Sequence, residues 1–131
     1  MLKRGVYAAS LSVLNKDLTL NVEATISHGE HLIKKGCTGV FFFGSTGASQ
    51  LLTLQEKKEF ISKIASNKFR KQFFLGTGCN SLNDNIDLIN YAMEYEFRDF
   101  LIMPPAYYKG NTDEGVFEFY KKIITATPKA K

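Results

Sequence analysis

Two adjacent hydroxyl residues, Ser45 and Thr46, lie between two glycines, Gly44 and Gly47, directly after an apolar run. Glycine lets backbone N–H groups approach a ligand closely, and neighbouring hydroxyls can donate hydrogen bonds to a carboxylate. A small anionic oxo-acid is therefore a ligand that suits this loop. The loop is neither a Walker A loop, because no GKS or GKT follows, nor a GxGxxG fingerprint. The alternative is an ordinary tight turn between a strand and a helix.

Two further loops follow apolar runs. Residues 76–80 (GTGCN) contain glycines that either clear space beside a ligand or form a turn ahead of a helix. Residues 103–110 contain two prolines, which stiffen the loop and hold Tyr107 and Tyr108 at the end of a strand. A positioned tyrosine hydroxyl can relay a proton. We predict this role for Tyr108, and a packing or interface contact for Tyr107.

The segments that position these loops are predicted strands. They are Gly5–Ala9, Gly39–Phe43, Gln72–Gly76 and Asp99–Met103. All are continuously apolar rather than alternating, which predicts parallel strands buried on both faces. Their starts lie 34, 33 and 27 residues apart, which is the length of a βα unit and not of a hairpin.

Helical periodicity fills the segments between and after the strands. Apolar stripes run through residues 22–33, 60–65, 86–93 and 116–124. Thr53 and Glu56 form a capping box for the second helix, Gly36 suits the end of the first, and Ser81 or Asn83 would cap the third. The resulting order βαβαβαβα predicts an α/β fold with a parallel sheet and right-handed crossovers.

The pattern leaves the closure of this sheet open. A doubly wound sheet would be complete at 131 residues. A (β/α)8 barrel needs roughly 250 residues, so four units make half of one. In both folds ligands bind at the carboxyl ends of the strands. A flavodoxin-like domain that binds a phosphate or nucleotide would place its phosphate loop at Ser10–Lys16, and that segment has no glycine.

Composition and charge indicate which classes of binding partner we expect the chain to have. Apolar residues make up 44% of the chain, charged residues 23%, and the formal net charge is +4. We expect no nucleic-acid partner, because no cluster of basic and aromatic residues stands out. The first apolar run is too short for a signal peptide or a membrane span, so we expect no membrane partner and a cytoplasmic location. Cys37 and Cys79 lie outside any metal-ligand spacing, and we expect free thiols with neither a metal nor a cofactor.

The order of the motifs resembles one family. GVYAA, GCTGVFFFGSTG, the TLQEK helix start, LGTGCN and MPPAYYKGNTDEG follow one another as in the dihydrodipicolinate synthase/N-acetylneuraminate lyase family. The resemblance covers about Gly5 to Ile124. It implies the N-terminal half of a TIM (β/α)8 barrel, with residues 1–131 as one domain made of the first four βα units. Members of the family form a Schiff base between a lysine and pyruvate, or another 2-oxo acid, and then make or break a carbon–carbon bond.

The resemblance also implies roles for single residues. Gly44, Ser45, Thr46 and Gly47 match the family's G-[ST]-T-G loop, so Ser45 would belong to a proton relay and Thr46, with its backbone N–H, would bind the substrate carboxylate. Tyr108 matches the second tyrosine of the family's pair, which in many members reaches into the active site of the neighbouring subunit. A homo-oligomer, dimer or tetramer, and a 2-oxo acid substrate such as pyruvate follow from the same resemblance.

The chain departs from the family in three places. Ala48 stands where the family has Glu, Ser12–Val13 replaces Thr-Pro, and Pro-Pro-x-Tyr-Tyr-Lys replaces Thr-Pro-Tyr-Tyr. The family's Schiff-base lysine lies in the sixth strand and its second relay tyrosine at the end of the fifth, whereas this chain ends at Lys131. We therefore expect the isolated chain to be inactive as an aldolase or lyase. A non-catalytic oxo-acid-binding or assembly module is the alternative.

The half barrel also predicts an incomplete core. With four strands and no closure, the inner face of the sheet would be half uncovered. We expect Phe41, Phe43, Phe73 and Leu75 to lie on that face.

Overall fold

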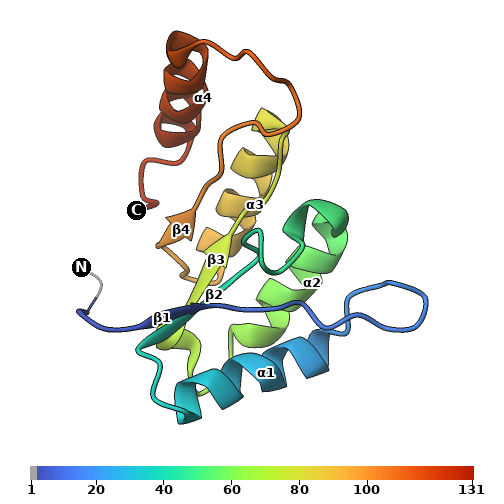
Figure 1. Cartoon of the computed structure of the whole chain (residues 1–131). Coiled ribbons are helices and arrows are strands. Elements are labelled where there is room, and N and C mark those ends of the chain that lie inside the picture. Colours follow the sequence, from blue (N-terminus) through green and yellow to red (C-terminus); the bar gives the residue numbers. More distant parts are fainter. Residues whose placement is uncertain (1–2) are drawn as a thin grey trace.

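The computed structural model describes residues 3–131 and contains one four-stranded sheet in the order β1-β2-β3-β4 (Figure 1). The strands are β1 (Tyr7–Ala9), β2 (Gly39–Phe42), β3 (Phe73–Gly76) and β4 (Phe100–Leu101). Every neighbouring pair is parallel, with Val40 opposite Phe73 in the central pair. The predicted parallel α/β sheet is confirmed.

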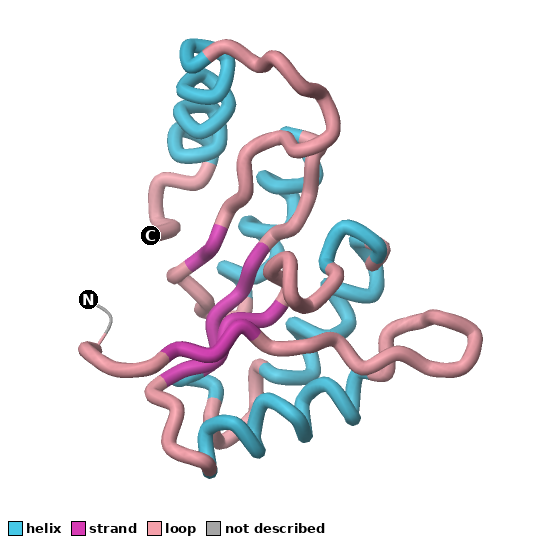
Figure 2. The backbone as a smooth tube through the Cα atoms, viewed as in Figure 1, coloured by secondary structure: helices cyan, strands magenta, loops and turns pink. Residues whose placement is uncertain are grey.

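Four helices connect and follow these strands. They are α1 (Val22–Lys34), α2 (Leu54–Ile64), α3 (Leu82–Glu94) and α4 (Asp113–Ala126), with 3-10 turns at η1 (Ser49–Leu51) and η2 (Arg70–Gln72). Figure 1 shows α1, α2 and α3 following one another around one side of the sheet, with α4 beyond β4. Figure 2 shows the segment between β1 and α1 extending outward as a long loop, which is closed by a bridge between Leu14 and Leu20. Within residues 3–131, no helix combines the length and the apolar character that crossing a membrane requires.

The helices begin at side chains that cap their first N–H groups. Asn21 accepts from the N–H of Ala24 at 2.9 Å ahead of α1, and Ser81, not Asn83, caps α3. The predicted capping box of α2 is confirmed: Thr53 Oγ1 accepts from the N–H of Glu56 at 3.2 Å, and the Glu56 carboxylate accepts from the N–H of Thr53 at 2.8 Å. Glu56 also accepts from the N–H of Leu20 at 2.7 Å, so the box ties α2 to the loop before α1.

The Thr53→Ala variant is expected to lose about 1 kcal/mol of unfolding free energy, because the cap of α2 is removed. Urea unfolding followed by circular dichroism measures this change. Gln55→Ala, an exposed position in the same helical turn, is the control and should change stability by less than about 0.5 kcal/mol. Equal stability of the two variants would contradict the prediction.

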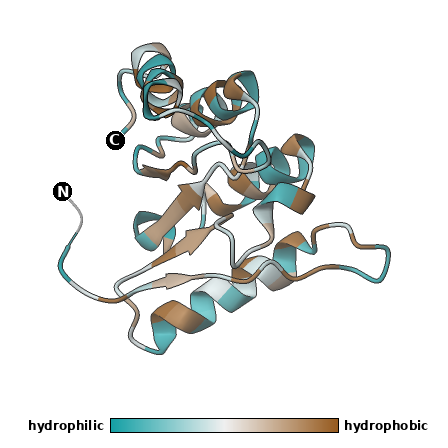
Figure 3. Cartoon of the chain, turned by 45° about the horizontal axis from the view of Figure 1, so that its top comes forward, coloured by the Kyte–Doolittle hydropathy of each residue, from teal (hydrophilic) through white to brown (hydrophobic). Residues whose placement is uncertain are grey.

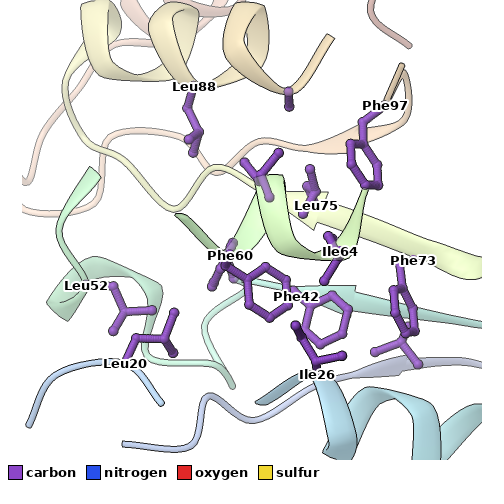
Figure 4. Close-up of a cluster of buried hydrophobic side chains, with 14 of the residues drawn as sticks. Leu20, Ile26, Phe42, Leu52, Phe60, Ile64, Phe73, Leu75, Leu88 and Phe97 are labelled. Atoms are coloured by element: carbon purple, nitrogen blue, oxygen red, sulfur yellow. The ribbon is translucent and has the colours of Figure 1, made fainter. Parts of the chain in front are cut away.

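The core lies between the sheet and the helices (Figure 4). Phe60 of α2 stands at its centre, with its ring centroid 4.7 Å from that of Phe42 and 4.9 Å from that of Phe43. Figure 3 shows the same arrangement as hydropathy, with apolar strands and helices that are apolar on one side and polar on the other.

We expected four side chains on the uncovered inner face of the sheet, and this prediction is wrong for three of them. Phe43, Phe73 and Leu75 are buried in the core on the helix side. Alternation along β3 places Phe73 and Leu75 together on that side. Phe43 joins Phe42 there because its backbone takes a left-handed conformation, with φ of 63°, which breaks the alternation.

Three aromatic rings occupy the opposite face of the sheet. Phe41 and Phe74 are paired across β2 and β3 with ring centroids 5.0 Å apart, and Tyr7 lies 5.5 Å from Phe74. Tyr7 and Phe41 are partly exposed. The edge strands β1 and β4 are also partly exposed, which corrects the expectation of burial on both faces. Each has a hydrogen-bonded neighbour on only one side.

Candidate functional site

The loops that follow β2, β3 and β4 meet at one edge of the sheet, because the strands are parallel. The Ser45 hydroxyl donates to the Met103 thioether at 3.3 Å and so joins the loop after β2 to the segment after β4. The Asn80 side-chain oxygen accepts from the N–H of Ala106 at 2.9 Å, which joins the loops after β3 and β4. This carboxyl edge is where parallel α/β folds bind ligands.

The loop after β2 exposes donors at its tip. Its glycines, Gly44 and Gly47, are buried, whereas Ser45 and Thr46 are exposed. The N–H of Gly47 donates to the Gly44 carbonyl and that of Ala48 to the Ser45 carbonyl, both at 3.1 Å. In the described part of the chain, the N–H groups of Ser45 and Thr46 donate to no protein acceptor. Successive unpaired N–H groups in a turn form a concave site for an anion.

Gly47 lies close to the loop after β1, so a larger residue would be crowded there. A Cβ at Gly47 would lie 3.0 Å from the Ser10 carbonyl oxygen and 3.2 Å from the Ser12 hydroxyl oxygen. Ser10 is itself fixed, since its N–H donates to the Phe41 carbonyl at 2.9 Å. The loop after β1 therefore packs against the GSTG turn at Gly47.

An open pocket of about 270 Å³ lies beside this turn. It is lined by Gly44, Ser45, Ala48, Ser49, Gln50, Leu51 and Met103. Of the predicted site residues, the structure thus brings Gly44 and Ser45 to the pocket, while Thr46 and Gly47 lie in the same turn outside its lining. Tyr108 is 76% exposed, does not line the pocket, and packs edge-on against Tyr107 with ring centroids 5.3 Å apart. The catalytic and binding roles of these residues stay predictions.

Two residues of this pocket carry features that sequence reasoning missed. Met103 supplies the acceptor for Ser45, although 58 residues separate them, and the pattern marks Met103 only as the end of a strand. Ser49 is buried, and its hydroxyl has no hydrogen-bond partner in the described structure. Nothing in the local sequence distinguishes either residue, since both features depend on the packing of separate loops.

A buried lysine lies beside the neighbouring loop. Lys57 of α2 is 2% exposed, and its Nζ donates to the Thr77 carbonyl at 3.0 Å. Burial lowers the pKa of Lys57, while the nearby Cys79 opposes that shift. The residue was missed, although the sequence contains a signal for it: Lys57 stands three and four residues before Phe60 and Ile61, on the apolar stripe of the helix.

The buried amine of Lys57 should make stability rise at alkaline pH. The unfolded chain keeps this proton up to the ordinary pKa of 10.5, whereas the folded chain releases it at lower pH. Between the two values the unfolded state binds more protons, so the unfolding free energy rises with pH. Denaturant titrations at several pH values should show this rise in the parent relative to Lys57→Met. Lys63→Met, at an exposed position of the same helix, should track the parent, and parallel curves for all three proteins would contradict the assignment.

Within 3–131, no group of three or more His, Cys, Asp or Glu side chains is placed to hold a metal ion. Cys37 and Cys79 are both free thiols, as expected.

Comparison with known proteins places this geometry in a family. The profile of the Dihydrodipicolinate synthetase family matches residues 2–130. The 4-hydroxy-tetrahydrodipicolinate synthase of Coxiella burnetii is 30% identical over 131 residues, which cover 96% of this chain and 45% of that protein. The chain thus spans less than half the length of this relative.

Solved structures of this family have the same fold as the chain. Dihydrodipicolinate synthase from Agrobacterium tumefaciens superimposes with a TM-score of 0.86 at 27% identity, covering 97% of this chain and 45% of that one. A prophage protein from E. coli K12, of the dihydrodipicolinic acid synthase family and solved in complex with pyruvate, has a TM-score of 0.83 at 23% identity, covering 98% and 43%. The four βα units have the fold of the N-terminal part of a (β/α)8 barrel.

Proposed function

Since the chain belongs to the dihydrodipicolinate synthetase family, we propose that it supplies the carboxylate-binding turn and part of the proton relay of a Schiff-base-forming lyase. The substrate would be pyruvate or another 2-oxo acid, next to which a carbon–carbon bond is made or broken. The observation that carries this proposal is the turn at Gly44–Gly47 on the carboxyl edge, where Ser45 and Thr46 are exposed and their N–H groups donate to no acceptor in the described structure.

These donors suit the carboxylate of an oxo-acid. Charge-assisted hydrogen bonds from N–H and O–H groups to a carboxylate are stronger than those between neutral groups. The present partner of the Ser45 hydroxyl is a thioether, which is a weak acceptor, so an arriving oxygen would compete well for it. Thr46 would then bind the carboxylate, and Ser45 would pass a proton.

The amine that forms the imine is proposed to lie outside these four strands. None of the strands β1 to β4 contains a lysine. A Schiff-base lysine must be largely deprotonated near neutral pH, which requires burial or a cationic neighbour. Lys57 is buried, but it lies beside the loop after β3 and does not line the Ser45 pocket.

Assembly into a homo-oligomer is part of the proposal. Leu51, Tyr107 and Tyr108 are 82%, 80% and 76% exposed, and Leu51 lies in the pocket wall next to Ser45. The rings of Tyr107 and Tyr108 pack together and form a contiguous exposed aromatic surface, which favours a contact with another subunit. We propose that Tyr108 contributes its hydroxyl to the active site of a neighbouring copy of the chain. We also propose that this assembly is located in the cytoplasm.

Borohydride trapping tests the assignment of the amine. The purified chain, incubated with pyruvate and borohydride, should show no stoichiometric adduct by intact mass. The chain mixed with the C-terminal half of the C. burnetii relative should form an adduct on that half. The relative's own two halves serve as the positive control. An adduct on the isolated chain, or no adduct in the mixture while the control succeeds, would overturn the proposal.

A non-catalytic oxo-acid-binding module is the second candidate, favoured by the absence of a lysine from β1 to β4. The coding sequence beyond Lys131 separates the two. A Tyr-Asn-x-Pro motif followed by a strand that contains a lysine supports the enzyme, whereas a stop codon supports the module.

A further inference from the structure

We propose that Lys57 and Cys79 form a reversible, oxidant-induced covalent link, a sulfenamide between Nζ and Sγ. It would fasten α2 to the loop after β3. Neither Lys57 nor Cys79 lines the pocket of Ser45, and neither has a role in the proposed lyase reaction.

The two reacting atoms are already held side by side. Lys57 Nζ lies 3.7 Å from Cys79 Sγ. Both groups donate to one acceptor, the Thr77 carbonyl, at 3.0 Å from the amine and 3.1 Å from the thiol. The shared acceptor keeps amine and thiol in contact, and the flexible stem of lysine lets Nζ close the remaining distance.

A small oxidant can reach the thiol. Lys57, Gly78, Cys79 and Asp84 belong to the wall of an open pocket of about 220 Å³. Cys79 is partly exposed, in contrast to Lys57. Gly78 fixes the path of the loop: its φ is +55°, and a Cβ there would lie 1.6 Å from the Ser49 hydroxyl oxygen. The position of Cys79 next to Lys57 is thus set by a backbone turn that other residues would strain.

The chemistry balances with hydrogen peroxide as the oxidant. The sulfur of Cys79 attacks one peroxide oxygen, the O–O bond breaks, and sulfenic acid and water form. The nitrogen lone pair of Lys57 then attacks the sulfur, the S–O bond breaks, and the leaving hydroxide takes a proton from the amine as water. The sulfur is oxidised, the peroxide is reduced, and the pair loses two hydrogen atoms in total. Two equivalents of an external thiol reverse the step and leave as a disulfide.

Burial favours the second step over the first. It lowers the pKa of Lys57, which raises the fraction of neutral amine able to attack. It also raises the pKa of Cys79, which lowers the thiolate fraction and so slows formation of the sulfenic acid. We therefore expect little sulfenic acid to accumulate.

Intact-mass spectrometry of the chain treated with hydrogen peroxide tests the proposal. The experiment uses the Cys37→Ser background, in which an intramolecular disulfide is impossible. The expected product is lighter by two hydrogen atoms, links the peptides that contain Lys57 and Cys79, and returns to the parent mass with dithiothreitol. Lys57→Arg keeps the charge and a donor for the Thr77 carbonyl but lacks the amine, so it should gain oxygen atoms instead.

Two results would overturn the proposal. One is a parent chain that gains oxygen at Cys79 with no loss of two hydrogens, as Lys57→Arg does. The other is an unchanged mass under conditions that oxidise Cys37 in the Cys79→Ser variant. Circular dichroism of each variant before treatment shows that the fold is intact, so that a missing link reports on the pair itself.

Discussion

The Phe60→Ala variant is expected to lose about 3 to 5 kcal/mol of unfolding free energy. Phe60 is fully buried, and its ring packs against those of Phe42 and Phe43, which come from the strand and the turn that hold the Ser45 loop. Removing the ring leaves a cavity that rigid aromatic neighbours cannot fill. Since domains of this size are stable by about 5 to 15 kcal/mol, the change is a large share of the total.

Chemical denaturation measures this loss. Phe117→Ala is the matched control, because Phe117 is 59% exposed on α4, and its loss should stay below about 0.5 kcal/mol. If Phe60→Ala does not fold, Phe60→Leu, which removes fewer buried atoms, should cost less but still more than Phe117→Ala. A loss for Phe60→Ala as small as that for Phe117→Ala would contradict the central place of Phe60 in the core.

Removal of the Ser45 hydroxyl should lower the turnover of the completed barrel by about 10² to 10⁴-fold. The reason is that Ser45→Ala removes a group of the proposed proton relay while leaving the backbone N–H groups of the turn in place. The rate is measured with the chain joined by the C-terminal half of the C. burnetii relative. The loss should fall mainly on kcat, because the N–H groups continue to bind the carboxylate.

Two variants separate the relay from a structural effect. Ser45→Thr keeps a hydroxyl and should retain most of the rate. Ser62→Ala removes a hydroxyl on α2 that donates to the Glu59 carbonyl and does not line the pocket of Ser45, and its rate should match the parent's. A Ser45→Ala protein as fast as the parent would exclude the relay role, and a loss carried by KM alone would assign Ser45 to binding.

Residues close in the chain determined much of this fold. Apolar runs spaced by one βα unit predicted four parallel strands, and the capping box at Thr53 predicted where α2 begins. For α3 the sequence left Ser81 and Asn83 as alternative caps, and the structure has Ser81. These features follow from backbone hydrogen bonding and from the two periods of helix and strand, which act over a few residues. Parallel order alone was enough to place the GSTG loop and the loops after β3 and β4 at one edge.

Tertiary structure decided which side chains share a surface. The left-handed backbone at Phe43 ended the alternation of β2 and moved that ring to the helix side, and strand period alone does not contain such a residue. The contact of Ser45 with Met103 depends on the register of strands that are far apart in sequence. Lys57 is a middle case: its place on the apolar stripe was visible, but its partner Cys79 came from another loop.

The same division holds for the candidate site. The types and spacing of Gly44–Gly47 predicted a turn rich in donors, since glycine and hydroxyl chemistry is local. Only the folded chain showed that Ser45 borders a pocket and that the Tyr108 ring is exposed and lies outside that pocket. Pockets and burial arise where separate loops pack together, and that packing is set by long-range contacts which a linear pattern does not encode.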